Sequence, residues 1–449
     1  MLTNMGRVFR RKIYDTLRSW KKREDGRSAL LVQGARRIGK STIVEEFAKN
    51  EYDTYILIDF TTCSREVREL FNDISDLNYI FIRLQLIYGV NLVERRSLII
   101  FDEVQFQPLA RQAIKSLVKD RRYDYIETGS LISIRKNVEG ILIPSEEKPV
   151  NMFPMDYEEF RWALGDTATI PLLRSVWEKP QPLSEAHRKL MRDFRLYMLV
   201  GGMPQAVNEY LDTNNLSAVD EVKRTILDLY DADFMKIDPS GRASKIFSAI
   251  PSQLYGNRSR YQLSSVIPNA DYSGYIELIS EIEKTMTVNI AHHCDDPNVG
   301  LGATENLTQY KIYAGDTGLF TTLAFKDKSF TENVIYGKLL SDSLPANLGY
   351  LYENIVAQTL AASGYKLFYH TWPTDSGKHS YEIDFLLSKG SKIVPIEVKS
   401  SSYKTHVSLD TFCEKYSSRL SNDRYLIYTK DYAKAGGVTY LPAYLTFLL

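Results

Sequence analysis

One short segment constrains this chain more than any other: residues 34–41 read GARRIGKS, which matches G-x-x-x-x-G-K-[ST] at every fixed position. The pattern requires glycines because backbone N–H groups must turn inward around phosphates, in conformations that a Cβ would block. Lys40 is expected to neutralise the β- and γ-phosphates, and the Ser41 hydroxyl to bind Mg²⁺. The segment lies between an apolar run, Ala29–Gln33, and a helical pattern, Thr42–Lys49. This context favours a phosphate-binding loop over an accidental glycine-rich turn.

Such a loop also needs an acidic metal partner at the tip of another strand, and the apolar run SLIIFDE supplies one. Asp102 is expected to hold Mg²⁺, directly or through water, and Glu103 to polarise the attacking water. The alternative is that both acids cap the next helix. A third run ends in ETGS, where Thr128 or Ser130 is expected to sense the γ-phosphate. The alternative there is a plain turn.

The order of apolar and helical patterns predicts three domains. In roughly the first 150 residues, continuous apolar runs alternate with helical patterns, which indicates a parallel sheet covered on both faces. The middle of the chain has helical patterns broken by prolines, and the remainder returns to a mixed α/β pattern. We expect a P-loop NTPase domain at residues 1–165, a mainly helical region at 166–345 and an α/β domain at 346–449. In the first domain we expect strands at 29–33, 55–60, 98–101 and 123–128, and helices at 42–49, 66–71 and 110–119.

Composition narrows the class of protein further. Lys+Arg and Asp+Glu number 56 each, so a generally basic nucleic-acid-binding surface is excluded, although a local basic patch is not. The 3 cysteines are widely spaced and odd in number, which argues against a disulfide framework and for a reducing compartment. No run approaches the ~18 apolar residues of a membrane span. We therefore expect a cytoplasmic protein without a membrane partner.

Near the C-terminus, residues 381–399 (YEIDFLLSKGSKIVPIEVK) read as a β-hairpin whose turn is SKGS. Gly390 in this turn is available for a positive φ. A symmetric four-residue loop would place Glu382 directly opposite Glu397. Because two opposed glutamates repel each other, this register predicts a cation between or near them.

The side-chain period of two places Glu382, Asp384, Glu397 and Lys399 on one face of the hairpin, opposite an apolar face. Asp384 and Glu397 are suited to chelate Mg²⁺, and Lys399 to stabilise a hydroxide or the charge that develops on a phosphate. Two alternatives stay open: a solvated charged strand face, and a nuclease-like fold that has lost or reduced its activity.

This pattern is similar to the D…(D/E)-x-K signature of the restriction-endonuclease-like fold. Glu353, on the preceding helical pattern, matches the extra acid that this fold often carries and is a further expected metal ligand. The similarity implies a metal-dependent nuclease site at Glu353, Asp384, Glu397 and Lys399. It also implies DNA or RNA as partners of the C-terminal domain.

Three further segments carry a wider resemblance: MFPMDYEEF at 152–160, YMLVGGMP at 197–204 and KIYAGDTGL at 311–319. With them, the chain resembles the bacterial and archaeal AAA-type ATPases that have a C-terminal domain of uncharacterised function. The resemblance implies ATP and Mg²⁺ as cofactors, and a helical lid followed by a winged-helix-like fold in the middle region. The expected nucleotide-binding residues are Gly34, Ala35, Arg36, Arg37, Ile38, Gly39, Lys40, Ser41, Thr42, Asp102 and Ser130.

One segment departs from that family. These ATPases often place a Gly-Arg pair just before the proline-containing strand, where the arginine serves as a finger on the γ-phosphate. Here residues 144–149 read PSEEKP, and the nearby arginines are Arg121, Arg122 and Arg135. Hydrolysis by the isolated chain is therefore expected to be slow, and a second copy of the chain is a candidate source of the arginine.

The sequence supports two hypotheses. In the first, the chain is an ATP-hydrolysing AAA-type protein whose nucleotide state controls a C-terminal nuclease-like domain. In the second, it is a nucleotide-gated binding or scaffold protein whose nuclease-like domain is catalytically inactive and grips nucleic acid or protein.

Overall fold

The computed structural model describes residues 7–129, 143–256, 259–268, 270, 274–325, 337, 340–341, 349–374, 376–377, 379–401 and 403–449. The chain separates into two compact units. Unit 1 comprises Met1–Phe153 and Lys284–Met286, and unit 2 comprises Pro154–Glu283 and Thr287–Leu449. The finer division into three domains stays a prediction. Among the described residues, no helix is both long enough and apolar enough to cross a membrane.

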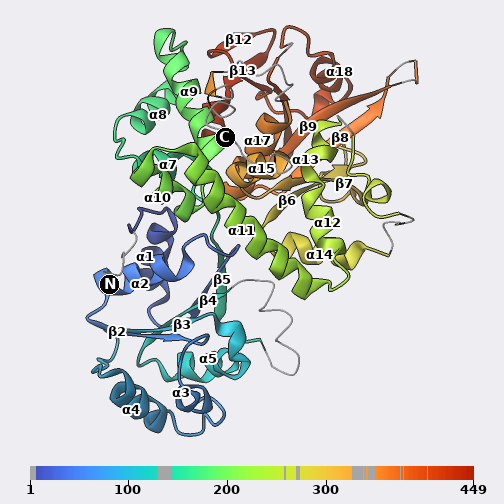
Figure 1. Ribbon diagram of the computed structural model, residues 1–449. Coiled ribbons are helices and arrows are strands. Elements are labelled where there is room, and N and C mark those ends of the chain that lie inside the picture. Colours follow the sequence, from blue (N-terminus) through green and yellow to red (C-terminus); the bar gives the residue numbers. More distant parts are fainter. Residues whose placement is uncertain are drawn as a thin grey trace. The chain divides into compact units, whose positions relative to one another are not determined.

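Unit 1 is built around a five-stranded sheet in the order β2-β3-β4-β1-β5, and every neighbouring pair is parallel. Helices α1 and α2 lie on one face of this sheet, and α3, α4 and α5 lie on the other (Figure 1). The predicted P-loop NTPase architecture, a parallel sheet covered on both faces, is thereby confirmed. The strands are β1 (Ala29–Gln33), β2 (Thr54–Asp59), β3 (Ser97–Asp102), β4 (Asp124–Gly129) and β5 (Glu147–Asn151). The helices are α1 (Ile13–Glu24), α2 (Lys40–Glu51), α3 (Arg65–Glu69), α4 (Leu77–Tyr88), η1 (Val104–Phe106) and α5 (Pro108–Asp120).

The strand order explains how distant sequence motifs meet. Strands β3, β4 and β1 are adjacent, and parallel strands end at the same edge of a sheet. The three segments that follow these strands are therefore brought together. All side chains of β3 are buried, and Phe60, Phe71 and Phe101 pack edge to face with ring centroids 5.2–5.8 Å apart. This aromatic packing stabilises the sheet face that α3, α4 and α5 cover, close to the edge where β3, β4 and β1 end.

Unit 2 contains a mixed eight-stranded sheet in the order β12-β13-β11-β10-β9-β8-β6-β7, together with most of the helices that the structure describes (Figure 1). The segment predicted to be helical contributes two of these strands, β6 and β7. The strands are β6 (Val288–Cys294), β7 (Glu305–Ala314), β8 (Leu367–Pro373), β9 (Ser380–Lys389), β10 (Lys392–Lys399), β11 (Tyr425–Tyr428), β12 (Ala433–Ala435) and β13 (Val438–Pro442).

The helices of unit 2 fall into a long run before β6 and a smaller set among the strands. The first set is α7 (Tyr157–Ala163), α8 (Thr169–Glu178), α9 (Glu185–Val200), α10 (Pro204–Thr213), α11 (Leu216–Ile237), α12 (Arg242–Ser248), α13 (Ile250–Tyr255), η2 (Leu263–Ser265) and α14 (Ile276–Lys284). The second set is α15 (Thr317–Ala324), α17 (Gly349–Ala362), α18 (Val407–Lys415), η3 (Ser417–Arg419) and η4 (Ala443–Leu448). Helix α17 packs against β6, β7, β8 and β10, so its side chains can reach several strands.

The predicted hairpin is present as β9 and β10, but its predicted register is wrong by two residues. The structure pairs Val394 with Leu387 and Ile396 with Phe385, so Glu382 and Glu397 are not opposed. The loop has two residues rather than four, and Gly390 takes the first with φ +61°. A glycine with positive φ at that position is typical of tight hairpins. Because the side-chain period is two, a shift of two residues keeps the predicted faces.

The segments YMLVGGMP and KIYAGDTGL meet in unit 2 as a packing junction. The Asp316 carboxylate accepts hydrogen bonds from the backbone N–H groups of Gly202 (2.6 Å) and Leu319 (2.9 Å). A Cβ on Gly201, where φ is +82°, would lie 2.3 Å from Asp316 Oδ1. The ammonium of Lys223 is fully buried and donates to the carbonyl of Leu199 (2.7 Å). Asp316 and Lys223 thus provide hydrogen-bond partners for backbone N–H and C=O groups that are buried where the helices pack closely.

Candidate functional site

The loop between β1 and α2 has the backbone shape that the glycine pattern predicts. A Cβ on Gly34 would lie 2.3 Å from the carbonyl oxygen of Met152, so only glycine fits there. Gly39 takes φ +91° directly before α2, and Arg37 takes φ +69° within the loop. Positive φ turns the peptide groups of the loop away from the ordinary extended path. The backbone conformation of the loop therefore depends on the positive φ of Gly39 and on the close packing of Gly34 against Met152.

Lys40 begins α2, and its side chain folds back over the loop. Its ammonium donates to the carbonyl oxygens of Ala35 (2.9 Å) and Gly34 (3.1 Å), and the residue is only 6% exposed. Burial lowers the pKa of Lys40 to about 8, and the nearby Glu103 and Asp102 offset part of this effect. A buried ammonium that donates to neutral carbonyl oxygens is poised to interact strongly with an anion.

Three side chains from three elements converge next to this lysine. The Ser41 hydroxyl of α2 donates to Asp102 Oδ1 at the end of β3, over 2.7 Å. The Thr128 hydroxyl of β4 donates to the same oxygen. A carboxylate and a hydroxyl at the end of adjacent strands form an oxygen ligand set of the kind that Mg²⁺ prefers. The structure thus brings Lys40, Ser41, Asp102 and Thr128 together.

Glu103 follows Asp102 with an unusual backbone conformation, φ +53°. A non-glycine residue in this region is strained, and such strain collects at functional sites. Its backbone N–H donates to Thr128 Oγ1 (3.4 Å), and its carboxylate accepts a hydrogen bond from Gln105 Nε2. The two acids therefore do not serve as simple helix caps: each is held in its own position at the edge of the sheet.

Two residues of this region have no counterpart in the sequence prediction. Arg11 donates to the carbonyl of Ile38 (2.9 Å) and to that of Phe153 (2.6 Å), and it is 6% exposed. Gln105 orients Glu103. In the sequence, Arg11 lies in the basic segment RVFRRK at 7–12, and Gln105 lies two residues after Glu103, but neither pattern specifies such contacts. Ser130, the other candidate γ-phosphate sensor, lies outside the described residues.

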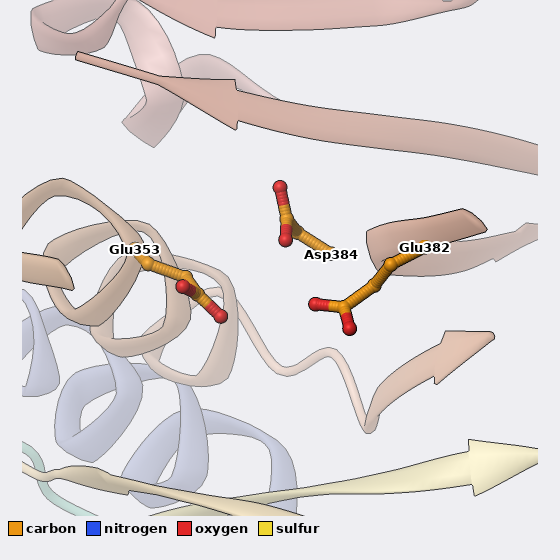
Figure 2. Close-up of side chains that lie close together, drawn as sticks. All are labelled: Glu353, Glu382 and Asp384. Atoms are coloured by element: carbon orange, nitrogen blue, oxygen red, sulfur yellow. The ribbon is translucent and has the colours of Figure 1, made fainter. Parts of the chain in front are cut away.

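Unit 2 holds a second group of ionisable side chains, the acidic cluster of Glu353, Glu382 and Asp384. Glu353 comes from α17, and the other two come from β9 (Figure 2). Each offers a carboxylate oxygen within 4.8 Å of the oxygens of the others. Glu353 and Asp384 are thus brought together as predicted, and Glu382 is added as the third member.

This cluster already has a cation. The Lys311 ammonium of β7 forms ion pairs with Glu353 (2.8 Å) and with Glu382, and the Lys311 side chain is 5% exposed. The Tyr313 hydroxyl donates to the same Glu353 oxygen over 2.6 Å. Burial lowers the pKa of Lys311, but Glu353 and Glu382 outweigh burial and raise it well above its usual range. The two carboxylates therefore favour the charged form of Lys311.

Asp384 and Glu397 have different surroundings. Asp384 accepts a hydrogen bond from the backbone N–H of Val398 (2.8 Å), and burial followed by repulsion from Glu353 raises its pKa well above the usual range. Glu397 is not part of the acidic cluster; its Oε1 pairs with Lys399 over 3.1 Å, and burial raises its pKa. The sequence predicted that Asp384 and Glu397 bind one metal ion together. Among the described residues, Asp384 belongs to the acidic cluster and Glu397 does not.

Comparisons with known families support the first site. Residues 26–161 match the sequence model of a family described as AAA domain. Residues 191–329 and 348–445 match two domains of unknown function, DUF8612 and DUF4143. The chain thus contains an AAA-type P-loop domain. The restriction-endonuclease-like and winged-helix-like assignments stay predictions. Among curated proteins, nothing matches the chain.

Solved structures give weaker similarities. A Walker-type ATPase of Pyrococcus abyssi, PABY2304, is 16% identical, covers 70% of this chain and 96% of its own, and has a TM-score of 0.41. PH0952 of Pyrococcus horikoshii, a signal transduction ATPase with a tetratricopeptide repeat sensor, is 12% identical, covers 80% of this chain and 48% of its own, and has a TM-score of 0.27. At these scores, neither similarity adds to the argument.

Proposed function

We propose that this chain binds ATP with Mg²⁺ at the loop of residues 34–41 and hydrolyses it. The observation that carries the proposal is the convergence of Ser41, Asp102 and Thr128 beside the buried ammonium of Lys40. Ser41 and Asp102 would hold Mg²⁺, Lys40 would neutralise the phosphates, and Thr128 would sense the γ-phosphate. Glu103 would polarise the attacking water. The match of residues 26–161 to an AAA domain supports this assignment.

The remaining residues of the loop have supporting roles in this proposal. Backbone N–H groups from Gly34 to Thr42 would surround the phosphates, together with the N-terminal end of α2. When ATP binds, the Lys40 ammonium would exchange its two carbonyl partners for phosphate oxygens. Phosphate oxygens are stronger hydrogen-bond acceptors because they are charged. Mg²⁺ would supply Lewis-acid activation of the γ-phosphate, while the protein groups supply orientation and charge.

Affinity for ATP is expected to fall as the pH rises above about 8. Without nucleotide, burial places the Lys40 pKa at about 8, and phosphate charges will raise it in the complex. Binding above that pH therefore takes up a proton, and affinity drops by up to about tenfold per pH unit. Lys40→Arg, which stays charged, should give a flat profile over the same range. Equal dissociation constants for the wild type at about pH 7 and 9 would contradict this coupling.

The expected arginine finger is not supplied by the arginines that precede β4. Arg122 is held by Asp120 (2.7 and 2.9 Å), and Arg121 is the first residue after α5. Both lie before β4, at the strand end opposite to Thr128, and roughly 3.3 Å per residue puts them about 20 Å from it. Arg135 lies outside the described residues. A finger from a second copy of the chain therefore stays part of the proposal.

If a second copy supplies the arginine, kcat per chain should rise with protein concentration until the assembly is complete. The measurement is steady-state ATP hydrolysis over about a hundredfold range of protein concentration at saturating Mg²⁺ and ATP. Light scattering on the same samples reports the oligomeric state as a control. A kcat that stays constant over the whole dilution range would remove the requirement for a partner subunit.

For unit 2, the structure favours the second hypothesis over a nuclease. In this proposal nucleotide state controls what unit 2 binds, with DNA, RNA or protein as the partner, and no strand is cut. The ion pairs of Lys311 with Glu353 and Glu382 favour it, because they already neutralise two of the carboxylates that a metal would need. A cleavage assay on plasmid, single-stranded DNA and RNA, with Mg²⁺ or Mn²⁺ and with and without ATP, tests it. Metal-dependent cleavage that Asp384→Asn abolishes would restore the nuclease hypothesis.

A further inference from the structure

The position of Lys311 differs from that of an ordinary surface ion-pair partner. Its side chain comes from β7, and the sheet order places β6 and β8 between β7 and the Glu382 strand, β9. The ammonium nevertheless reaches both Glu353 and Glu382, and it lies 5.6 Å from the ring centroid of Tyr369 on β8. The side chain thus extends over the sheet and ends among the carboxylates.

We infer that Lys311 fills the position that a divalent cation would take among Glu353, Glu382 and Asp384. The acidic cluster is then an internal ion-pair centre of unit 2 rather than a metal site. This inference does not depend on the proposed ATPase function of unit 1.

The charges of the cluster support this assignment. A divalent ion would have to bind carboxylates that already pair with an ammonium, whose nitrogen is 2.8 Å from Glu353 Oε1. Two cations on one pair of carboxylates repel each other, so a metal would bind less favourably unless it displaced the ammonium. The Lys311 side chain is 5% exposed, and displacement would leave its charge in a buried position without these partners. Metal binding is therefore opposed by the fold itself.

Neighbouring donors also bind the carboxylates of the cluster. Tyr313 donates its hydroxyl hydrogen to Glu353, and the backbone N–H of Val398 donates to Asp384. Each of the three carboxylates thus has a donor from the protein: Lys311 and Tyr313 for Glu353, Lys311 for Glu382, and Val398 for Asp384.

The test is Mn²⁺ binding to the nucleotide-free full chain, measured by electron paramagnetic resonance of the free ion. Wild type and Asp384→Asn should bind the same amount of Mn²⁺, because the cluster contributes no site. Lys311→Met removes the ammonium but keeps the length of the side chain, and it should gain one Mn²⁺ site per chain that the wild type lacks. Adding Asp384→Asn to Lys311→Met should remove that site again.

Lys311→Arg is the matched control, because it keeps a positive charge and should gain no Mn²⁺ site. If Lys311→Met does not fold, the inference is tested by comparing the amount of Mn²⁺ that the wild type and Asp384→Asn bind. The inference is overturned if the wild type binds a Mn²⁺ ion that Asp384→Asn removes. It is also overturned if folded Lys311→Met gains no site, since the ammonium would then not stand in a cation position.

Discussion

Replacing Glu103 by glutamine is expected to lower kcat for ATP hydrolysis by roughly 10²–10⁴-fold, the usual contribution of a general base, while ATP binding stays close to that of the wild type. The structure gives the reason. Glu103 lies beside Asp102, which would hold Mg²⁺, and the Gln105 amide orients its carboxylate. Glutamine keeps the shape of the side chain but polarises water poorly. Steady-state hydrolysis and equilibrium ATP binding of the same preparations measure the two effects separately.

Glu69→Gln is a suitable control for the change of charge. Glu69 belongs to α3 in the same unit, its side chain is 50% exposed, and it pairs with Arg65 on the surface. This variant should hydrolyse ATP like the wild type, because exposed ion pairs contribute little. If Glu103→Gln retained half of the wild-type kcat, the role of Glu103 in activating water would be wrong, although the binding site itself would stand.

Lys40→Ala is expected to have the second large effect: ATP hydrolysis should fall by at least about a hundredfold, because an ammonium directed at the phosphates is lost. The same change should not destabilise the nucleotide-free chain. Burial lowers the Lys40 pKa from 10.5 to about 8, so its charged form opposes folding below about pH 8. Thermal unfolding at about pH 7 should therefore give a midpoint equal to or above that of the wild type.

Lys49→Ala is the matched control on the same helix, because the Lys49 side chain is 47% exposed and forms a surface ion pair with Glu45 across one helical turn. It should leave both hydrolysis and unfolding unchanged. A Lys40→Ala midpoint far below that of the wild type would mean that Lys40 stabilises the loop through its carbonyl contacts. The loss of hydrolysis would then be a folding effect rather than a loss of phosphate binding.

Much of the nucleotide site follows from local sequence. Strand β1 occupies the predicted residues Ala29–Gln33, and Gly34 and Gly39 have the tight packing and positive φ that the pattern requires. These features depend on neighbours in the chain and on the strand–loop–helix order, which periodicity makes visible. Thr128 was one of two candidates for the γ-phosphate sensor, and the parallel order of β3 and β4 brings its hydroxyl to Asp102.

The second site depends on contacts that no local pattern specifies. Lys311 is 42 residues from Glu353 and 71 residues from Glu382 in sequence, and its strand belongs to a region expected to be helical. The predicted register of the hairpin was also wrong, because the strands are joined by a two-residue turn and not by the four-residue loop that was expected. The predicted faces survived that error, since two residues are one full side-chain period. Sheet order, rather than spacing, decides which charges meet.

The most direct test of the nucleotide site is a calorimetric titration of Mg²⁺-ATP into the nucleotide-free full chain, with wild type, Lys40→Ala and Lys49→Ala compared at about pH 7. The wild type and Lys49→Ala are expected to bind one ATP per chain with the same dissociation constant. Lys40→Ala should bind at least about a hundredfold more weakly, since it loses the ammonium beside the loop. If Lys40→Ala bound ATP as tightly as the wild type, residues 34–41 would not form the ATP site.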